Sequence, residues 1–385
     1  MSGARGHGMG LEWVEPDWPA LSAEDVQPLL ARLPAAGHLQ ALRWHSPRPF
    51  SAAALADCTG GPLFIKRHHP AVRSAAELSE EHRFIDWLRT HGAPVAEVLV
   101  DSAGHSAFEL DGWTYEVHRQ AEGLDLYRDA QSWTAYRDSA QAFAAGAALA
   151  RLHRAAQGYH AAPRSTRVLQ SNLHLFGSSD PIAAIERAAD ASPALADYLA
   201  GRDWRGELRR WHLPLQASLL PWLHRQAPLW THNDWHPSNL LWQPGGDASV
   251  SAVLDFGLAD RTFALFDLAT AVERACISWL DEANGQVPVA DLDGLDALLD
   301  GYASECPLQR DDLLTLIALL PLVHGDFALS EVIYFHGIVQ APANTALAYD
   351  GYLIGHTRWF LEAAGQRLLE HLRQRAQSGA PSLRT

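Results

Sequence analysis

The stretch THNDWHPSNLLW, residues 231–242, places two histidines, an aspartate and an asparagine within eight positions, directly before an apolar run. A second strand-like run, VSAVLDFG, reaches Asp255 thirteen residues after Trp242. We expect the two runs to form an antiparallel hairpin, with both flanking loops open on the same side of it. The spacing therefore predicts that Asp234, Asn239 and Asp255 share one polar cleft.

The three oxygen-bearing side chains of this cleft indicate a particular chemistry. Carboxylate and amide oxygens suit a hard cation such as Mg²⁺. A carboxylate that does not bind the metal can orient and deprotonate a hydroxyl nucleophile. Phosphoryl transfer requires these parts, because metal ions bridge the phosphates while a base is aimed at the acceptor oxygen. We therefore expect a site for phosphoryl transfer.

Such a site also needs a cation for the nucleotide phosphates, and GPLFIKRHH (61–69) offers Lys66 at the end of an apolar strand. The helix predicted over 75–92 supplies a carboxylate partner, Glu81, with Glu77 one turn earlier. A strand lysine paired to a helix glutamate is how kinases fix the α- and β-phosphates. Two alternatives stay open: Lys66 as a solvated basic strand end, and Glu77 or Glu80 as its partner.

The pattern along the chain predicts an α+β protein with a small β-rich lobe followed by a larger, mainly helical lobe. We expect a flexible tail at 1–20, a nucleotide-binding lobe at 21–118 and a catalytic and substrate-binding lobe at 119–385. Strands are predicted at 53–58, 61–68, 95–101, 106–111, 113–119, 239–242 and 250–256. Helices are predicted near 22–33 and at 75–92, 139–156, 181–191, 194–200 and 211–227, and from 262 to near 375.

Bulk composition excludes several classes of protein. A formal net charge of −15 leaves no basic excess to neutralise a nucleic-acid backbone. No run approaches 18 apolar residues, so no membrane span is expected, and the first ten residues lack the apolar region of a secretory signal. Three widely spaced cysteines argue against a disulfide framework and favour a reducing cytoplasm. Nothing in the sequence indicates an oligomeric state.

The order of these motifs resembles the aminoglycoside phosphotransferase and choline kinase-like family, which shares the bilobal protein-kinase fold. The resemblance is carried by H-x-D-x-x-x-x-N at 232–239 and DFG at 255–257, preceded by Lys66 and Glu81. It runs from about residue 45 to residue 275. It implies that Asp234 is the catalytic base, that Asn239 and Asp255 bind Mg²⁺, and that Lys66 holds the α- and β-phosphates with Glu81 as its ion-pair partner.

The resemblance also implies roles for residues outside the two motifs. Asp267, at the start of DLATAVER (267–274), would brace the catalytic loop. The segment Glu116-Val117-His118 would be the hinge whose backbone meets adenine. No G-x-G-x-x-G precedes Lys66, and the chain reads HSPRPFSAAAL (45–55) there. Ser46 or Ser51, with nearby N–H groups, would then hold the phosphates.

Three histidine and asparagine positions of the catalytic loop need separate interpretation. Asn233 stands where the family commonly has glycine, and asparagine tolerates positive φ better than most residues. We expect His232 to brace the loop by a hydrogen bond to backbone. His236 reaches the transferred phosphate or the acceptor, or it caps the loop. A metal site made of His232 and His236 is an alternative that would need a third ligand.

The run VHGDFALSEVIYFHG (323–337) lies in the helical region that lines the acceptor pocket in the family. Asp326 and Glu331 would grip a substrate ammonium there, or they are ordinary solvated helix positions. We therefore expect an enzyme that moves the γ-phosphate of ATP, or alternatively GTP, to a hydroxyl of a small molecule, which would be an aminoglycoside, amino alcohol or amino acid if it bears an amine.

Two other functions are weighed against this expectation. A protein kinase needs a longer activation segment than the stretch between Asp255 and Asp267, which are twelve positions apart and have no A-P-E element between them. A non-catalytic nucleotide sensor or scaffold on the same fold is the second alternative. Such a protein would usually lack the base or a metal ligand, and here all of them are present.

Overall fold

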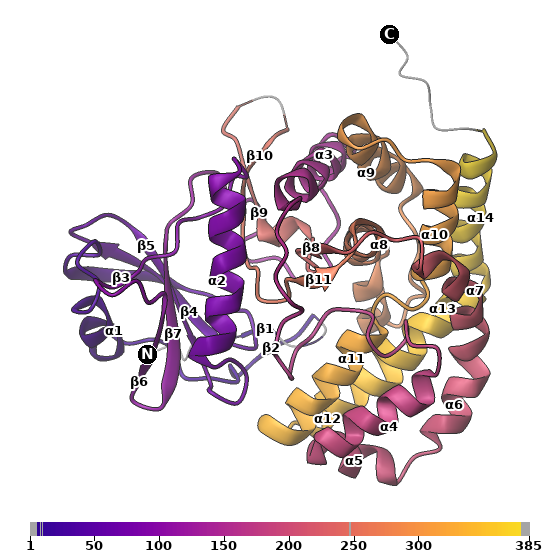
Figure 1. Cartoon of the computed structure of the whole chain (residues 1–385), viewed down its shortest axis with the longest axis horizontal. Coiled ribbons are helices and arrows are strands. Elements are labelled where there is room, and N and C mark those ends of the chain that lie inside the picture. The colour runs from indigo at the N-terminus through magenta and orange to yellow at the C-terminus, as the bar shows by residue number, and fades with distance from the viewer. Residues whose placement is uncertain (1–5, 8, 10, 246–247, 379–385) are drawn as a thin grey trace.

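The structure is a computed structural model that describes residues 6, 7, 9, 11–245 and 248–378. A β-sheet part, coloured indigo to purple in Figure 1, lies beside a larger part made mainly of helices. This architecture confirms the predicted α+β class. Among the described residues, no helix combines the length and the hydropathy that crossing a bilayer requires.

The β-rich part is built on a five-stranded antiparallel sheet with the strand order β3-β4-β5-β7-β6. Its hairpins form where the sequence predicts turns. Gly61, at φ +107°, lies between β4 and β5, while Asp111 (φ +49°) and Gly112 (φ +79°) join β6 to β7. In the resulting register Lys66 on β5 lies opposite Glu116 on β7. The strands are β3 Leu39–His45, β4 Ala52–Cys58, β5 Leu63–His68, β6 Ala107–Leu110 and β7 Trp113–Arg119.

The run 95–101 does not form the strand that its composition predicts. It makes only two isolated bridges, Val95 to Val253 and Val98 to His118. The run passes from β10 to β7, so its backbone forms one bridge with each strand. It does not form a continuous ladder with either of them. Strand β3, in contrast, forms in the structure but was not predicted. Its side chains are mostly exposed, so its sequence has no apolar run to indicate a strand.

Two helices accompany the sheet, and each begins with a capping box. In α1, Ala23–Leu30, the Ser22 hydroxyl accepts from the backbone of Asp25, as its sequence predicts. In α2, Ala75–Thr90, Ser74 and Glu77 form the equivalent pair. Helix α2 turns Glu81 and His82 inward along with its apolar residues. Because α2 contacts both the sheet and α3, this helix connects the two parts of the molecule.

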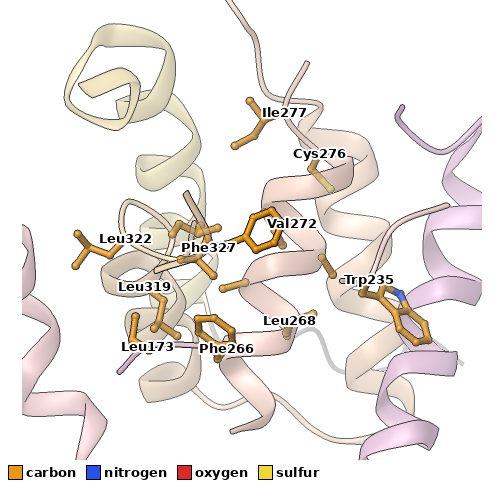
Figure 2. Packing of buried hydrophobic residues seen from close by; sticks show 14 of the residues in the cluster. Leu173, Trp235, Phe266, Leu268, Val272, Cys276, Ile277, Leu319, Leu322 and Phe327 are labelled. Carbon is orange, nitrogen blue, oxygen red and sulfur yellow. The ribbon is translucent and has the colours of Figure 1, made fainter. Parts of the chain in front are cut away.

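The helical part is organised around α3, Ser139–Ala156, α8, Ala264–Ala275, and α9, Leu292–Glu305. Helices α3 and α9 pack closely because a Cβ on Gly146 would lie 2.0 Å from the Leu298 carbonyl oxygen and one on Gly301 would lie 1.9 Å from that of Phe143. Helix α8 is buried along its whole length, and Figure 2 shows its apolar side chains packed among those of neighbouring segments.

The remaining helices cover this core. The predicted helix 211–227 corresponds to α7, which is shorter, and the preceding helix α6, separated from α7 at His212, was not predicted. The α-helices are α4 Pro181–Ala191, α5 Pro193–Ala200, α6 Trp204–Trp211, α7 Leu213–Leu223, α10 Arg310–Leu319, α11 Gly325–Val332, α12 Pro342–Ala346, α13 Thr357–Leu361 and α14 Ala363–Ser378. The 3₁₀-helices are η1 Pro237–Asn239 and η2 Trp279–Asn284. The π-helices are η3 Ile333–Ile338 and η4 Leu347–His356.

Two small pairs of antiparallel strands flank the loop of the THNDWHPSNLLW motif, residues 231–242. Strand β8, Leu229–Thr231, pairs with β11, Asp260–Thr262, and β9, Leu240–Trp242, pairs with β10, Val250–Val253. The loop 232–239 runs from β8 to β9, and the loop 254–259 runs from β10 to β11. Because both loops connect the same two pairs, the polar residues that they carry are brought together, as predicted.

The first twenty residues were expected to form a loose tail, and residues 1–5, 8 and 10 of it lie outside the described part of the chain. The described residues are anchored at several points, although Leu11, Trp13 and Val14 stay exposed. Strands β1, Gly6–His7, and β2, Trp13–Val14, pair with each other. The Tyr352 hydroxyl donates to the Met9 carbonyl at 2.8 Å, and Trp18 Nε1 donates to the Tyr334 hydroxyl at 3.1 Å. Aromatic residues of the C-terminal helices thus hold this segment, a contact too distant in sequence to predict.

Candidate active site

Two adjoining cavities lie between the β-rich and the helical parts. The sheet-side cavity is lined by Leu55, Glu81, Glu116, Gln120 and Leu241 among others. The helix-side cavity is lined by Trp133, Asp234, Arg274, Phe327 and Glu331 among others. Both cavities share Lys66, Asn239 and Asp255 in their walls. Three of the residues predicted from sequence therefore lie where the two cavities meet.

The loop 232–239 is held in place by the carboxylate of Asp267, which is fully buried at the start of α8. This carboxylate accepts hydrogen bonds from the backbone of His232 (2.8 Å) and Asn233 (2.9 Å) and from Nε2 of His153 (3.0 Å). Asn233 has φ +60°, in the left-handed region that asparagine tolerates better than most residues. Asp267 therefore lies where a brace for this loop is needed.

The ring of His232 joins the two loops of the site. Its Nε2 lies 2.9 Å from the Leu254 carbonyl oxygen, and its Nδ1 accepts the backbone N–H of Asp234 at 3.2 Å. Nδ1 of His236 lies 2.8 Å from the Ser238 hydroxyl. Among the described residues, these two histidines do not belong to a group with metal-ligand spacing. The alternative of a two-histidine metal site is therefore not supported.

Asp234 lies in the wall of the helix-side cavity with its side chain 17% exposed. Its Oδ1 is 3.4 Å from a guanidinium nitrogen of Arg274, and its Oδ2 is 3.5 Å from Nε2 of His236. Burial favours the neutral acid, but His236 and Arg274 outweigh it and hold the pKa of Asp234 below its usual value. The carboxylate is therefore ionised at neutral pH and reaches a cavity large enough for another molecule.

Asn239 and Asp255 lie on the two loops beside Asp234. The amide nitrogen of Asn239 donates to the Asp234 carbonyl (2.9 Å) and to its Oδ2 (3.1 Å), which leaves the amide oxygen for a cation. Asp255 adopts φ +56°, its side chain is 41% exposed, and its Oδ1 accepts from Lys66 Nζ at 2.9 Å. Burial lowers the pKa of the Lys66 amine, but Asp255, Glu116 and Glu81 together raise it above its usual value. Lys66 is thus a charged amine at the junction of the cavities.

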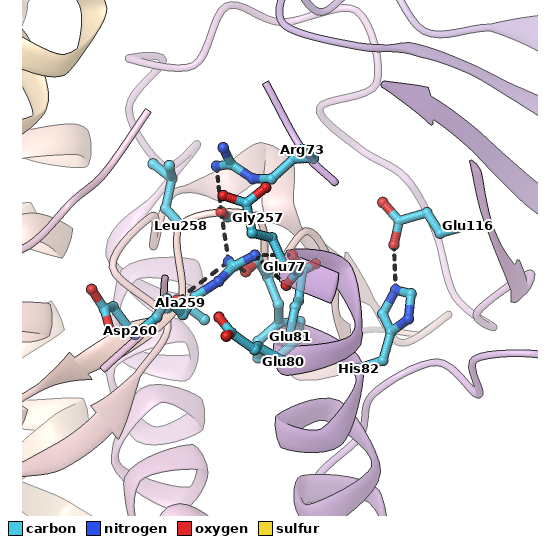
Figure 3. Close-up of polar contacts among 12 residues, drawn as sticks. Arg73, Glu77, Glu80, Glu81, His82, Glu116, Gly257, Leu258, Ala259 and Asp260 are labelled. Carbon is cyan, nitrogen blue, oxygen red and sulfur yellow. Dashed lines mark hydrogen bonds and ion pairs between the residues drawn. The ribbon is translucent and has the colours of Figure 1, made fainter. Parts of the chain in front are cut away.

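The predicted ion pair between Lys66 and Glu81 is not formed. Glu81 Oε2 lies 3.1 Å from a guanidinium nitrogen of Arg164, and both side chains are almost fully buried. Arg164 and Arg73 each donate to the Gly257 carbonyl oxygen at 2.9 Å, just after Asp255. Figure 3 shows the acidic residues of α2 grouped beside this loop. Glu81 therefore contacts the DFG loop through an arginine that no motif in the sequence identifies.

The segment 116–118, expected to be the hinge, lies within β7, where its backbone pairs with β5, and the Val117 carbonyl also accepts from the Leu99 N–H. The Glu116 side chain lines the sheet-side cavity and is bonded by three histidines, one of them His118. The chain leaves the sheet after Arg119, and Gln120 and Ala121, which follow, also line the sheet-side cavity.

The segment between β3 and β4 covers the junction of the cavities. Ser46 and Ser51, the predicted phosphate-binding serines, both line the helix-side cavity, and the Ser46 hydroxyl accepts from the backbone of Arg48 at 3.2 Å. Arg48 lines both cavities and donates to the Ser132 hydroxyl at 2.8 Å. Burial lowers the pKa of its guanidinium, while Asp234 and Asp255 act to raise it. Arg48 therefore adds a cation at the junction of the cavities, and the sequence motifs did not predict it.

The two acidic residues predicted on the C-terminal helices have different positions. Glu331 lines the helix-side cavity, and burial raises its pKa to about 8. Asp326 is buried away from this cavity and accepts from the backbone of Leu175 (2.7 Å) and Phe176 (3.1 Å). Both alternatives for Asp326, a substrate ligand and a solvated position, are therefore wrong, because it ties α11 to a neighbouring loop.

Sequence reasoning missed Arg274, whose guanidinium is the cation nearest to Asp234 among the described residues. The signal was present, because Arg274 lies seven residues after Asp267 on the same helix, and positions seven apart share a face. The guanidinium also lies 4.9 Å from the ring of Trp133 and 5.2 Å from that of Phe327. It therefore connects the base to the aromatic wall of the helix-side cavity.

Together these groups can carry out phosphoryl transfer. An ionised carboxylate faces one cavity, an amine and a guanidinium face the junction, and two oxygen ligands lie between them. The free amide oxygen of Asn239 and the exposed carboxylate of Asp255 fit a hard divalent cation, since both are oxygen donors.

Comparison with known proteins agrees with this geometry. The model of a family described as "Phosphotransferase enzyme family" matches residues 50–308 of the 385. None of the curated proteins matches the chain.

Solved structures with the same fold include an aminoglycoside phosphotransferase from Alicyclobacillus acidocaldarius, with 15% identity, a TM-score of 0.53, and coverage of 94% of this chain and 98% of that one. A microcompartment-associated aminopropanol kinase has 15% identity, a TM-score of 0.58, and coverage of 91% and 98%. The amicoumacin kinase hAmiN, solved with AMP-PNP and Ca²⁺, has 15% identity, a TM-score of 0.53, and coverage of 93% and 94%. At this level of identity these likenesses show a common fold.

Proposed function

The chain belongs to the phosphotransferase enzyme family, and from this membership we propose that it transfers the γ-phosphate of ATP to a hydroxyl group of a small molecule. Membership and fold together make it a small-molecule phosphotransferase. We propose in addition which nucleotide, metal and acceptor the protein uses, and which residues bind them. The observation that carries it is the shared wall of Lys66, Asn239 and Asp255 between two cavities, with Asp234 beside it.

In this proposal Asp234 is the catalytic base. A bound acceptor in the helix-side cavity would donate its hydroxyl proton toward the Asp234 carboxylate as the oxygen attacks phosphorus. Arg274 and His236 keep the carboxylate ionised and fix its direction. A base with so low a pKa is weak in solution, so its contribution is chiefly to orient the hydroxyl for in-line attack.

The nucleotide would occupy the sheet-side cavity. Lys66 would hold the α- and β-phosphates, Arg48 and the backbone near Ser46 and Ser51 would approach the outer phosphates, and the backbone at Gln120 would meet the base. Lys66 is held by Asp255 rather than by Glu81, which supports its direction toward the junction. GTP is the alternative nucleotide, because backbone groups at Gln120, rather than a side chain, would contact the nucleotide base.

Asn239 and Asp255 would hold Mg²⁺, which would supply positive charge to offset that of the nucleotide phosphates. The bond from the Asn239 amide nitrogen to Asp234 supports this assignment, because it turns the amide oxygen away from the base. The ion pair with Lys66 supports an ionised Asp255. Both side chains are thus in the state that a hard cation requires.

For the acceptor, we propose a hydroxyl compound that bears an amine, such as an amino alcohol, an aminoglycoside or an amino acid. Glu331 offers a carboxyl group in the wall of the helix-side cavity, and Trp133 and Phe327 offer aromatic surface around it. A cation that enters beside Glu331 would stabilise its ionised form, which burial alone disfavours.

The experiment is a screen of acceptor-dependent ADP release over amino alcohols, aminoglycosides, amino acids and sugars, with ATP and GTP tested separately. At least one amine-bearing alcohol should stimulate ADP release, and Asp234→Asn should remove the stimulation while MgATP still binds. Release that no acceptor stimulates, together with intact nucleotide binding, would favour a nucleotide sensor instead.

A further inference from the structure

Outside the catalytic centre, two buried clusters combine histidines and a carboxylate at metal-ligand spacing. One consists of His82, Glu116 and His118, and the other of Glu273, His324 and His356. In each, the candidate ligand atoms lie within 4.8 Å of one another. Similar spacing does not make the two clusters equivalent, because their hydrogen bonding differs.

The cluster in the β sheet satisfies its own polar groups. Both oxygens of Glu116 accept hydrogen bonds from Nε2 atoms, those of His68 (2.9 Å), His82 (2.8 Å) and His118 (2.8 Å). The second nitrogen of His82 is bonded as well, to the Ser106 hydroxyl at 2.9 Å. With each ring directed at the same carboxylate, this cluster is complete as a hydrogen-bond network, and it offers no unused ligand atom on Glu116.

The cluster in the helical part is not satisfied. Glu273 is 1% exposed, His356 3% and His324 7%. Among the described residues, both carboxylate oxygens of Glu273, both ring nitrogens of His356 and Nε2 of His324 lack a hydrogen bond of good geometry. Around the carboxylate, the described residues make only ion-pair contacts, from His356, His324 and Arg274. Buried polar atoms without partners cost free energy, and native proteins rarely leave several in one place. Such a group indicates that another species completes it.

Three separate elements bring these side chains together. Glu273 is near the end of α8, His324 immediately precedes α11, and His356 ends η4. Nδ1 of His356 lies 3.1 Å from Oε1 of Glu273, and Nδ1 of His324 lies 3.9 Å from Oε2. The His356 ring stacks on Trp279 at a centroid distance of 3.6 Å, which fixes its direction. Two imidazole nitrogens therefore converge on one carboxylate.

From this geometry we propose that Glu273, His324 and His356 bind a Zn²⁺ ion through one carboxylate oxygen and two imidazole nitrogens. Two nitrogen donors with one oxygen donor suit zinc, whereas magnesium prefers oxygen donors alone. Three protein ligands leave one position of a tetrahedron for water. This site shares no residue with the proposed magnesium site, and it does not depend on the proposed function.

Two further observations agree with zinc as the occupant. Nε2 of His324 lies 3.9 Å from Oε2 of Glu331, and metal-bound histidines commonly direct their other nitrogen toward a carboxylate. His324 also packs against the His356 ring, at a centroid distance of 5.2 Å, so the two candidate ligands are neighbours. The ion would tie α8 to α11 and η4, one residue away from Arg274, which contacts the base.

The test uses the full-length protein, freed of metal with EDTA, desalted, and kept in excess Mg²⁺ so that oxygen sites are saturated. Zn²⁺ is titrated in competition with a chromophoric chelator, without nucleotide or acceptor. We expect one Zn²⁺ per chain in wild type, and binding weakened about tenfold or more by His324→Asn, His356→Asn or Glu273→Gln. Co²⁺ added in place of zinc should give the visible absorption of a four-coordinate site.

The matched control is His82→Asn with His118→Asn in the sheet cluster, which should leave zinc binding unchanged. Zinc should also raise the melting temperature of wild type, a measurement that needs no variant to fold. Wild type that neither competes with the chelator nor gains thermal stability would overturn the proposal. So would zinc binding that survives the His324 and His356 substitutions, or that is lost in the His82 and His118 control. Because no phosphoryl transfer is measured, failure of the proposed function would leave the result unaffected.

Discussion

The sheet-side and helix-side cavities share a wall but are built in different ways. Lys66 and Asp255 reach the junction from two short motifs, one on β5 and one on the loop 254–259, and bond to each other there. The helix-side cavity collects residues from the N-terminal segment, from the region around Trp133, from α8 and from α11. If the sheet-side cavity binds the nucleotide, as proposed, its ligands come from motifs that can be recognised by their spacing. An acceptor pocket depends on helix packing, and short motifs do not reveal it.

The largest effect is expected at the junction itself. Asp234→Asn keeps the shape of the side chain but removes the charge that would accept the hydroxyl proton, so kcat should fall about 10³-fold. The dissociation constant of MgATP should change little, because Asp234 lines only the helix-side cavity. Steady-state kinetics and calorimetry measure the two quantities. Equal losses of turnover and nucleotide affinity would show that the two cavities are not separate.

The next effect tests the sheet-side cavity. Lys66→Ala removes the amine at the junction, and the KM for ATP should rise about 10- to 100-fold, given the usual strength of charged hydrogen bonds. The KM for the acceptor should stay within about threefold. Arg205→Ala is the control, because Arg205 makes an exposed ion pair with Glu186 between α4 and α6, outside both cavities. An unchanged ATP KM would contradict the assignment of this cavity to the nucleotide.

A smaller effect should identify the helix-side cavity. Glu331→Gln keeps the volume of the side chain but cannot become an anion, so the KM for an amine-bearing acceptor should rise about tenfold. The KM for ATP should not change. Kinetics with one saturating and one varied substrate separate these outcomes, and a change confined to the KM for ATP would place the acceptor elsewhere.

The smallest effect on activity is expected five residues earlier on the same helix. Asp326→Ala removes two backbone hydrogen bonds outside both cavities. We expect kcat/KM within about threefold of wild type and a loss of about 1–3 kcal/mol in the free energy of unfolding. Denaturant unfolding and kinetics on the same preparation test this, and a large loss of acceptor affinity with normal stability would restore Asp326 as a substrate ligand.

The sequence identified what local patterns encode. The catalytic loop, its Asn233 in place of glycine and the helices α1 and α2 were predicted from residues a few positions apart. Asp234, Asn239, Asp255 and Lys66 line one cavity, as expected. The local predictions succeed because the bonds concerned join neighbouring segments, whereas Lys66 and Asp255 are 189 positions apart and were linked through a motif.

Errors arose where one group had to choose among several partners. Glu81 was assigned to Lys66 by its place on α2, but Arg164 reaches it from a loop 83 residues away. The segment 116–118 was expected as a hinge, but its backbone belongs to the sheet ladder, which continues through Val117 and His118. The described N-terminal residues pack on helices more than 300 positions distant. Such contacts depend on tertiary packing, which the local pattern of apolar and polar residues does not reveal.

The most direct test of the account is phosphorus NMR of the reaction products with the best acceptor from the screen. We expect one phosphomonoester of the acceptor for each ADP formed by wild type, and neither product in quantity from Asp234→Asn. Inorganic phosphate as the only product, or phosphate retained on the protein, would contradict transfer from one cavity to a hydroxyl in the other.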